Sequence, residues 1–201
     1  MRVLFIIPAA FNYFADISQA AFHLAEKLQA EGVHVEPFTL QYSQPSREFK
    51  KSVGPHGSKQ RGFTYKETIP FKELHAALSV ADIIHLHIPF LGFGGEILRF
   101  KKNNPSVPLV ITRYRHVPYQ DLFSLFVMGY NAYYGPKLAA EADALVDFSG
   151  SVFKKELVKG HFKKSETLTN AESGVQLLYT ANEKQPFFIK YLTLLSQHSY
   201  F

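Results

Sequence analysis

Apolar residues follow two alternating periods along most of the chain. Short runs of β-branched and aliphatic residues, bounded by turn residues, are typical of strands buried on both faces of a parallel sheet. Between them, apolar residues recur every three or four positions, as in helices packed against a sheet. The predicted strands are 2–7, 33–40, 82–88, 107–114, 143–147 and 165–169. The predicted helices are 16–30, 71–80, 94–103, 120–141 and 149–159, the fourth with a break near Gly129 or Gly135. This alternation predicts an α/β fold: a doubly wound, Rossmann-like parallel sheet flanked by helices, in a single domain.

Two segments depart from this alternation. Residues 41–70 are polar, with Ser, Gly, Pro and Lys, and predict a long loop with a short strand near 63–69. Residues 183–201 are instead rich in Phe, Tyr and Leu, which predicts a helix at 183–196 whose apolar face packs on the domain. A helix that binds a partner is the alternative. We therefore expect a Rossmann-like domain over 1–182, followed by an apolar helix over 183–201.

Composition narrows the class of protein. The chain has 201 residues, of which 46% are hydrophobic, and no cysteine, so disulfides and thiolate metal sites are excluded. No apolar run is long enough to span a bilayer, and the first run is too short for a signal peptide, so cytoplasm is the expected location. The net charge is +5, and lysines occur in pairs at 50–51, 101–102, 154–155 and 163–164. We interpret most of these lysines as solvated helix ends. The alternative is a surface that attracts anionic lipid or phosphorylated sugars, which implies peripheral membrane contact. No nucleic-acid motif is present.

The segment 81–96 carries the strongest functional signal. An apolar strand ends at Pro89 and runs into a glycine-rich loop that includes Gly94 and Gly95. His85 and His87 are two residues apart, so both side chains lie on one face at the strand's carboxyl end, where open α/β sheets bind ligands. The preferred interpretation is a pair of imidazoles hydrogen-bonded beneath the loops. The alternatives are contact of His87 with an acceptor, or a metal pair. No third ligand has recognisable spacing, so we predict no metal.

The order of these segments resembles the amino-terminal domain of retaining family-4 glycosyltransferases, which have the two-domain GT-B architecture. The resemblance covers roughly residues 1–175. Residues 20–35 are similar to the family's first helix and the turn into its second strand, and 81–87 to its strand with an aspartate, two aliphatics and His-x-His. Residues 108–112 resemble the next strand. Residues 142–154 resemble the end of the domain, and 170–175 the turn that leads into the second domain.

Two departures from the family limit what the resemblance implies. The family's first loop usually carries paired glycines near the donor phosphates, whereas residues 9–15 contain none. We expect Asp16 to cap the following helix. Both Asn12 and Asp16 remain able to hydrogen-bond a polar ligand. The chain also ends at Phe201, before the family's nucleotide-sugar domain. The resemblance therefore implies no cofactor here, and a nucleotide sugar only where a donor-domain protein supplies the second half of the site.

A second polar cluster follows the strand at 107–114. Arg113, Tyr114, Arg115 and His116 lie where the family has a Thr-x-His near the reacting sugar, with Tyr114 in the expected place. Arginine binds phosphate or carboxylate bidentately, so this cluster predicts an anion contact. A solvated loop paired to Asp121 is an equal alternative. The aromatic residues between 119 and 134 have helical spacing and are predicted to be mostly core, while any exposed ring would stack on sugar or face lipid.

Three functional hypotheses remain open. The first is a glycosyltransferase-like acceptor-side domain, a subunit or fragment that needs a donor-domain protein and takes a sugar or glycolipid acceptor. The second is a non-catalytic sugar- or lipid-binding or regulatory module. The third is an unrelated α/β enzyme that works alone. No catalytic residue is assigned. The expected ligand-binding residues are Asn12, Asp16, His87, Gly94, Gly95, Arg113, Tyr114, Arg115 and His116.

Overall fold

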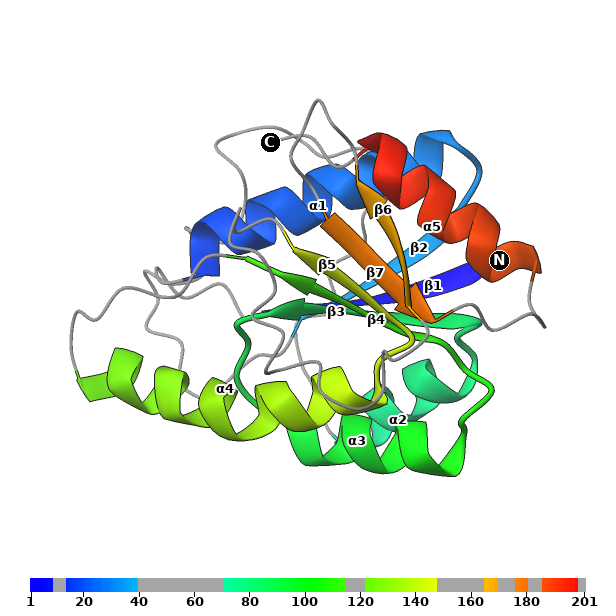
Figure 1. Cartoon of the computed structure of the whole chain (residues 1–201). Coiled ribbons are helices and arrows are strands. Elements are labelled where there is room, and N and C mark those ends of the chain that lie inside the picture. Colours follow the sequence, from blue (N-terminus) through cyan, green and yellow to red (C-terminus); the bar gives the residue numbers. More distant parts are fainter. Residues whose placement is uncertain are drawn as a thin grey trace.

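The sheet is the organising element of the fold. A computed structural model describes residues 1–8, 14–39, 71–114, 122–147, 165–169, 176–180 and 186–198. Seven strands lie in the order β2-β1-β3-β4-β5-β7-β6 (Figure 1). Their bounds are β1 Arg2–Ile7, β2 His34–Thr39, β3 Ile83–Ile88, β4 Leu109–Arg113, β5 Ala144–Asp147, β6 Ser165–Thr169 and β7 Gln176–Thr180. Strands β1 to β5 are parallel, which confirms the predicted Rossmann-like α/β domain.

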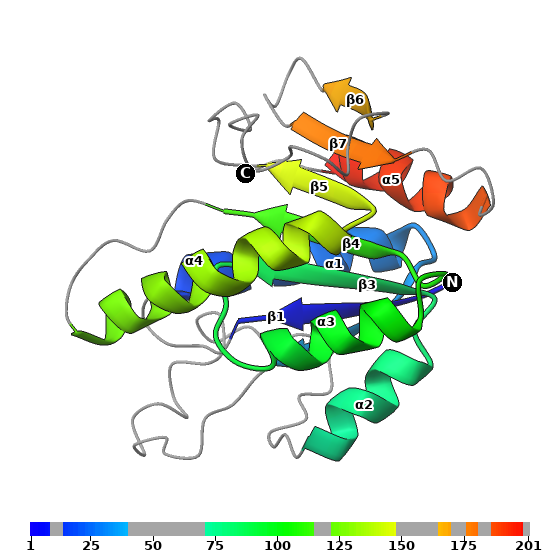
Figure 2. The ribbon, with the colours of Figure 1, turned by 60° about the horizontal axis from the view of Figure 1, so that its bottom comes forward.

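Helices cover both faces of the sheet. Helices α1 (Ala15–Ala30) and α5 (Pro186–His198) lie on one face, and α2 (Phe71–Ser79), α3 (Gly94–Asn103) and α4 (Leu122–Glu141) lie on the other (Figures 1 and 2). A search of these helices finds none that is long and apolar enough to cross a membrane. The two-sided arrangement follows from the strand pattern, since strands that are apolar on both faces need helices on both faces.

The side chains of strand β1 point alternately to the two faces of the sheet and so contribute to two hydrophobic cores. Val3 and Phe5 point to the α1/α5 face, whereas Leu4 and Ile6 point to the α2/α3/α4 face, and all four are at most 1% exposed. Successive strand side chains point to opposite faces, so a continuous apolar run is what a doubly covered strand requires. Helix α1 contributes Ala21, Leu24, Ala25 and Leu28 to the first core. The four-residue spacing of Ala20, Leu24 and Leu28 predicts this buried side of the helix, and Ala20 is buried as well.

The tail helix α5 belongs to the first core. It begins at Pro186, three residues later than predicted. Proline suits this first helical position because the N–H that it lacks would be unsatisfied there anyway. Phe188, Tyr191 and Leu192 are at most 1% exposed and pack in the same cluster as Val3 and the apolar side chains of α1. Each such side chain stabilises the fold by roughly 1.5–3 kcal/mol through removal from water.

Two features differ from the sequence prediction. Helix α4 runs unbroken past Gly129 and through Pro136, so the predicted break is wrong. An internal proline costs about 3 kcal/mol, but Leu138 is fully buried in the second core, with Tyr130 and Tyr134 packed against that core, so tertiary contacts hold the helix together. Strand β7 was not predicted, and it pairs antiparallel with both β5 and β6. The predicted helix 149–159, strand 63–69 and turn 170–175 lie outside the residues that the structure describes.

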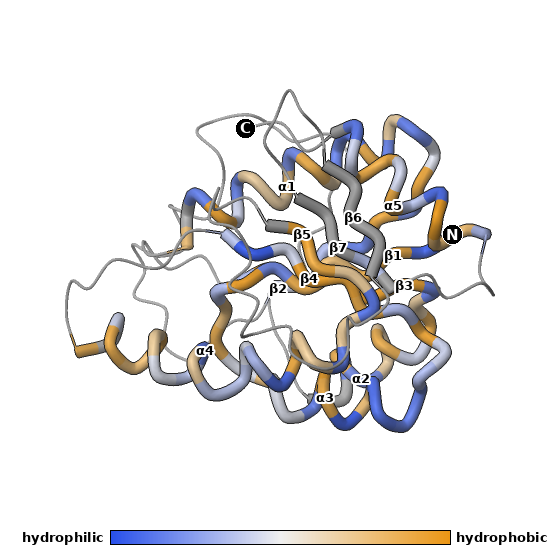
Figure 3. Tube along the Cα trace, viewed as in Figure 1, coloured by the Kyte–Doolittle hydropathy of each residue, from blue (hydrophilic) through white to orange (hydrophobic). Residues whose placement is uncertain are grey.

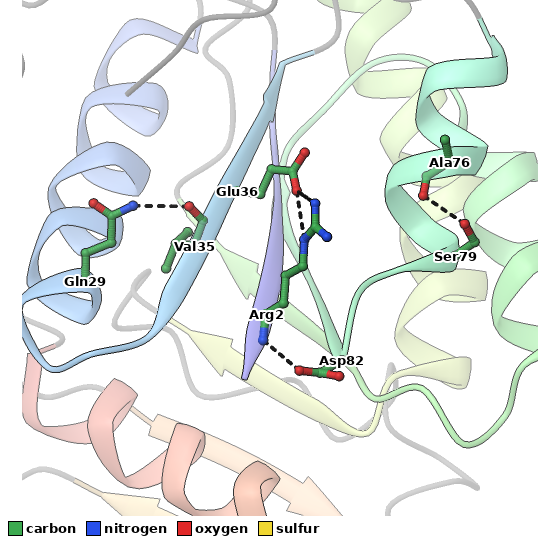
Figure 4. Close-up of polar contacts among 7 residues, drawn as sticks. All are labelled: Arg2, Gln29, Val35, Glu36, Ala76, Ser79 and Asp82. Atoms are coloured by element: carbon green, nitrogen blue, oxygen red, sulfur yellow. Dashed lines mark hydrogen bonds and ion pairs between the residues drawn. The ribbon is translucent and has the colours of Figure 1, made fainter. Parts of the chain in front are cut away.

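Charged groups hold the amino ends of the strands, which we call the amino edge. The backbone N–H of Arg2 donates to Asp82 Oδ2 at 2.7 Å, and its guanidinium Nε donates to Glu36 at 3.0 Å (Figure 4). These contacts join the start of β1 to β2 on one side and to the residue before β3 on the other. They support the pairing register in which Arg2 lies opposite His34.

Lys101 is the second anchor of the amino edge. Its ammonium donates to Asp143 Oδ2 at 2.7 Å and to the carbonyl oxygens of Pro105 and Val107 at 3.0 and 2.9 Å. The residue is only 5% exposed, so its interpretation as a solvated helix end is wrong. All three N–H bonds of the ammonium have an acceptor, because two carbonyl groups of the loop between α3 and β4 accept two of them and Asp143 accepts the third.

Candidate functional site

The strand order reverses between β1 and β3, which makes this the topological switch point of the sheet. The chain leaves β1 for α1 on one face and leaves β3 for α3 on the other (Figure 2). In open α/β sheets, ligands bind outside the carboxyl ends of the strands at such a point. We call this side of the sheet the carboxyl edge. Its described residues include Pro8, Phe14 at the start of α1, the β3–α3 connection at 88–94, and Tyr114 after β4.

His85 is completely satisfied by two hydroxyl groups. Its Nδ1 lies 2.6 Å from Tyr191 Oη on α5, and its Nε2 lies 2.6 Å from Thr112 Oγ1 on β4. A neutral imidazole has one N–H and one bare nitrogen, so one hydroxyl accepts a hydrogen bond and the other donates one. The residue is fully buried. His85 therefore joins β3, β4 and α5 and is a structural group, as the preferred interpretation predicted.

His87 is satisfied at only one of its two ring nitrogens. Nδ1 lies 3.0 Å from Tyr114 Oη, whereas Nε2 has no hydrogen-bond partner within the described part of the chain. The side chain is fully buried, and its ring stacks on His85 with centroids 4.4 Å apart. A buried polar atom without a partner costs about 1–3 kcal/mol. This nitrogen is the one unsatisfied buried side-chain atom among the residues that the structure describes, and it lies at the switch point.

Burial keeps both histidines neutral. It lowers the pKa of His87 to about 3, and burial together with the neighbouring His87 lowers the pKa of His85 well below its ordinary value. Burial also raises the pKa values of Tyr114 and Tyr191, so both hydroxyls keep their protons. The cluster can donate and accept hydrogen bonds at neutral pH, but it holds no charge and no base that is ready to take a proton.

The glycine-rich loop is held by α4. Gly94 N–H donates to Tyr130 Oη at 2.8 Å, while the Asn131 side chain accepts from Phe90 N–H at 3.0 Å and donates to Phe90 O at 2.7 Å. A Cβ on Gly94 would lie 2.8 Å from the Tyr134 ring. The glycine is thus required by aromatic packing from its own chain. At Gly95 a Cβ would lie at an ordinary 3.6 Å from Tyr134 Oη.

The start of α1 differs from its prediction. The helix begins at Ala15 with Phe14 as its N-cap residue, and no side chain makes a capping hydrogen bond there. Asp16 is exposed and lies inside the first turn, so its expected role as the cap is wrong. It still has a favourable place, because a carboxylate near a helix amino terminus is stabilised by the helix dipole. Nearby, Ser18 Oγ donates to Pro8 O at 3.2 Å and ties α1 to the end of β1.

The arginine-rich cluster is only partly described. Arg113 ends β4 and Tyr114 follows it; both are partly buried, and the Tyr114 hydroxyl reaches His87. The structure therefore brings His87 and Tyr114 together. Gly94, Gly95 and Arg113 share the same edge, with Asp16 one turn into α1. Asn12, Arg115 and His116 lie outside the described residues, as does Asp121, the alternative partner of the arginines.

Three residues that matter to the site were missed. Tyr191 lies 106 positions from His85, so no local pattern could pair them. Tyr130 and Asn131 were visible only as members of a helical aromatic run, although an asparagine inside that apolar run was a signal that its amide needed partners. The expectation that the aromatic run is mostly core holds for Tyr130 and Tyr134, which are partly buried, but it is wrong for Phe126 and Tyr133, which are exposed.

The described residues contain no candidate metal site. No group of three or more histidine, cysteine, aspartate or glutamate side chains that could hold a metal ion occurs among the described residues. Comparisons with known proteins add no assignment, since neither a scan against protein-family models nor a search of curated proteins gives a match to this chain. The functional conclusion must rest on the geometry of the carboxyl edge.

Proposed function

We propose that the chain is a glycosyltransferase-like acceptor-side domain that binds a sugar or a glycolipid headgroup at the carboxyl edge and transfers sugar only with a separate donor-domain protein. The observation that carries this proposal is the buried Nε2 of His87 at the switch point. The ring is fully buried, so a ligand reaches Nε2 only where the groups that cover it move aside. A sugar hydroxyl both donates and accepts hydrogen bonds, so it can then satisfy this nitrogen in either tautomer of the ring.

The neutral character of the histidine–tyrosine cluster supports a sugar over an anion as the partner of His87. His85, His87, Tyr114 and Tyr191 are uncharged at neutral pH for the reasons given above. Sugar hydroxyls need neutral hydrogen-bond partners and aromatic surface, and Tyr114 provides both beside His87. A nucleotide diphosphate would need cationic or helix-terminal contacts, which these four side chains do not supply. We therefore assign the nucleotide sugar to a partner protein, and we place the reaction in the cytoplasm, at a membrane surface where the acceptor is a glycolipid.

The first experiment tests the ligand site. Titrate the chain with monosaccharides and soluble glycolipid headgroups, and follow the imidazole nitrogens by NMR. We expect Nε2 of His87 to shift while both nitrogens of His85 stay in place. The variant His87→Phe keeps an aromatic ring without nitrogens, and we expect it to weaken binding by about tenfold, as for loss of one neutral hydrogen bond. His23→Gln, on the exposed outer side of α1, is the matched control.

Two outcomes would contradict the proposal. Sugar-induced shifts confined to the amino edge would place the ligand elsewhere. Multiple turnover of a nucleotide sugar by the purified chain alone would favour the unrelated stand-alone enzyme, because the proposal requires two substrates to be held by two domains.

A second candidate function is a non-catalytic sugar- or lipid-binding or regulatory module. The observation that favours it is that both histidines are neutral and buried, which leaves no proton-transfer group in the described cluster. Sugar binding at His87 that persists while no donor-domain protein elicits transfer would support this candidate over the first.

A further inference from the structure

Helix α4 exposes a line of large apolar side chains on its outer face. Leu122 is 80% exposed, Leu125 51%, Phe126 60% and Tyr133 59%. Together with Gly129, these residues follow spacings of three and four along the helix, so they form one stripe, which we call the outer stripe. The amino-terminal half of α4, which carries most of it, extends past the carboxyl edge of the sheet and is largely hydrophobic (Figures 2 and 3).

The opposite face of α4 is already packed. Ser124, Val127 and Leu138 are fully buried, and they lie on the other side of the helix from the outer stripe. Large apolar side chains therefore lie on both sides of α4, which is typical of a helix covered on both sides. Contiguous exposed apolar surface of this kind marks an interaction site.

Gly129 lies at the middle of the outer stripe, where no contact within the described part of the chain requires a glycine. A Cβ at this position would meet nothing within 4 Å, and the residue does not have a positive φ. Glycine inside a helix is less favourable than alanine because the unfolded chain gains more freedom. A close approach by another helix would explain it, since a glycine lets two helix backbones come near each other.

We propose that a second copy of this chain covers the outer stripe, with the two α4 helices crossing antiparallel at Gly129. Under two-fold symmetry Leu125 of each copy faces Tyr133 of the other, so the stripe is complementary to itself. Four half-exposed large side chains on each copy, at about 100 Å² each, together with the surface beside them bring the total buried area to roughly 1,000 Å², the lower bound for a specific interface.

Charge favours a second copy over a lipid surface. The segment 122–136 contains no Lys, Arg, Asp or Glu, so two copies of a chain with net charge +5 meet there without opposed like charges. Helices that lie on anionic lipid carry several cations beside the apolar face. Within α4 the cation is Lys137, whose ammonium lies 3.3 Å from the centroid of the Tyr133 ring.

Sedimentation equilibrium of the full chain tests the proposal. We expect a monomer–dimer equilibrium whose dissociation constant rises roughly 30-fold or more in Phe126→Glu, as for an interface hot spot. Ile189→Glu is the matched control, because Ile189 is likewise an exposed apolar residue on a helix, with 42% of its surface exposed on α5. It should leave the equilibrium unchanged, and circular dichroism should show both variants folded.

A cross-link gives a test that does not depend on disruption. The chain has no cysteine, so Gly129→Cys introduces a single thiol. On mild oxidation it should form a covalent dimer within minutes, while Ile189→Cys should not, because a disulfide requires Cα atoms less than about 7 Å apart. A wild-type chain that is monomeric at all concentrations would overturn the proposal. So would a Phe126→Glu chain that still dimerises, or a monomer that binds phosphatidylglycerol vesicles through α4.

Discussion

The two edges of the sheet satisfy their buried polar groups in opposite ways. At the amino edge, Lys101 and Asp143 are charged and nearly buried, and the ammonium has an acceptor for each of its three N–H bonds. At the carboxyl edge, His85 and His87 are neutral, and one of their four ring nitrogens has no partner among the described residues.

On the proposed function, the difference separates a structural edge from a binding edge. A buried charge is tolerated only with complete pairing, because its desolvation is costly, so the amino edge has no freedom to exchange partners. A neutral nitrogen without a partner costs far less, and a ligand hydroxyl can recover that cost on binding. The following predictions test this comparison, from the largest expected effect to the smallest.

The amino edge should be the most sensitive to loss of one partner. We expect Lys101→Met to lower the free energy of unfolding by roughly 3 kcal/mol, because the partly buried Asp143 carboxylate loses its cation while it keeps the Leu109 N–H as a donor. Urea denaturation measures this change. Lys102→Met is the matched control: its ammonium is on the same helix but 64% exposed and 3.8 Å from Glu141, so the variant should stay close to wild type. Equal effects of the two variants would contradict the distinction.

The carboxyl edge should make the fold sensitive to acid. The pKa of His87 is lowered in the folded chain, so between pH 6.5 and about 3 the unfolded chain binds more protons and the free energy of unfolding falls as pH falls. From pH 7 to pH 5, His87 alone should account for about 2 kcal/mol of that fall. His85 acts in the same direction. Urea titrations at several pH values should show a shallower dependence in His87→Phe than in the wild-type chain. A pH dependence unaltered by His87→Phe would show that the folded chain protonates this ring freely.

The glycine loop gives the smallest expected effect. Gly94→Ala should lower the free energy of unfolding by roughly 1–2 kcal/mol, because the new methyl group would lie 2.8 Å from the Tyr134 ring. Gly95→Ala meets only an ordinary 3.6 Å contact and should leave stability unchanged or slightly raised. Thermal unfolding compares the pair. If Gly95→Ala destabilised the chain as much as Gly94→Ala, the tyrosine packing would not be the reason for the glycine.

Local patterns predicted a helix or strand well where residues close in the sequence decide its conformation. Helix α3 has the predicted bounds Gly94–Asn103, since a glycine-rich loop opens it and its apolar positions keep helical spacing. The break near Pro136 was wrong because local propensity was outweighed by burial of Leu138 in a core built from distant strands. Strand β7, which lies between β5 and β6, was missed because its five residues Gln176–Thr180 are too short a run to carry a clear strand pattern.

The sequence indicated the edge of the sheet at which the candidate site lies, but not the contacts within the site. The His-x-His pattern placed both imidazoles on one face of β3, since strand side chains alternate with a period of two. Whether each ring nitrogen has a partner depended on Tyr191, Thr112 and Tyr114, which reach β3 from α5 and β4.

The amino-acid sequence by itself determined the alternation of strands and helices, the two apolar faces of the sheet and the edge at which polar residues gather, because backbone geometry turns periods of two and about 3.6 into faces. Only the tertiary structure decided that Lys101 is buried, that one nitrogen of His87 has no partner within the described part of the chain, and that the outer stripe of α4 is exposed. These three properties depend on what packs against a side chain. The decisive partners, such as Asp143 for Lys101 and Tyr114 for His87, come from segments far away in the chain, which no local period encodes.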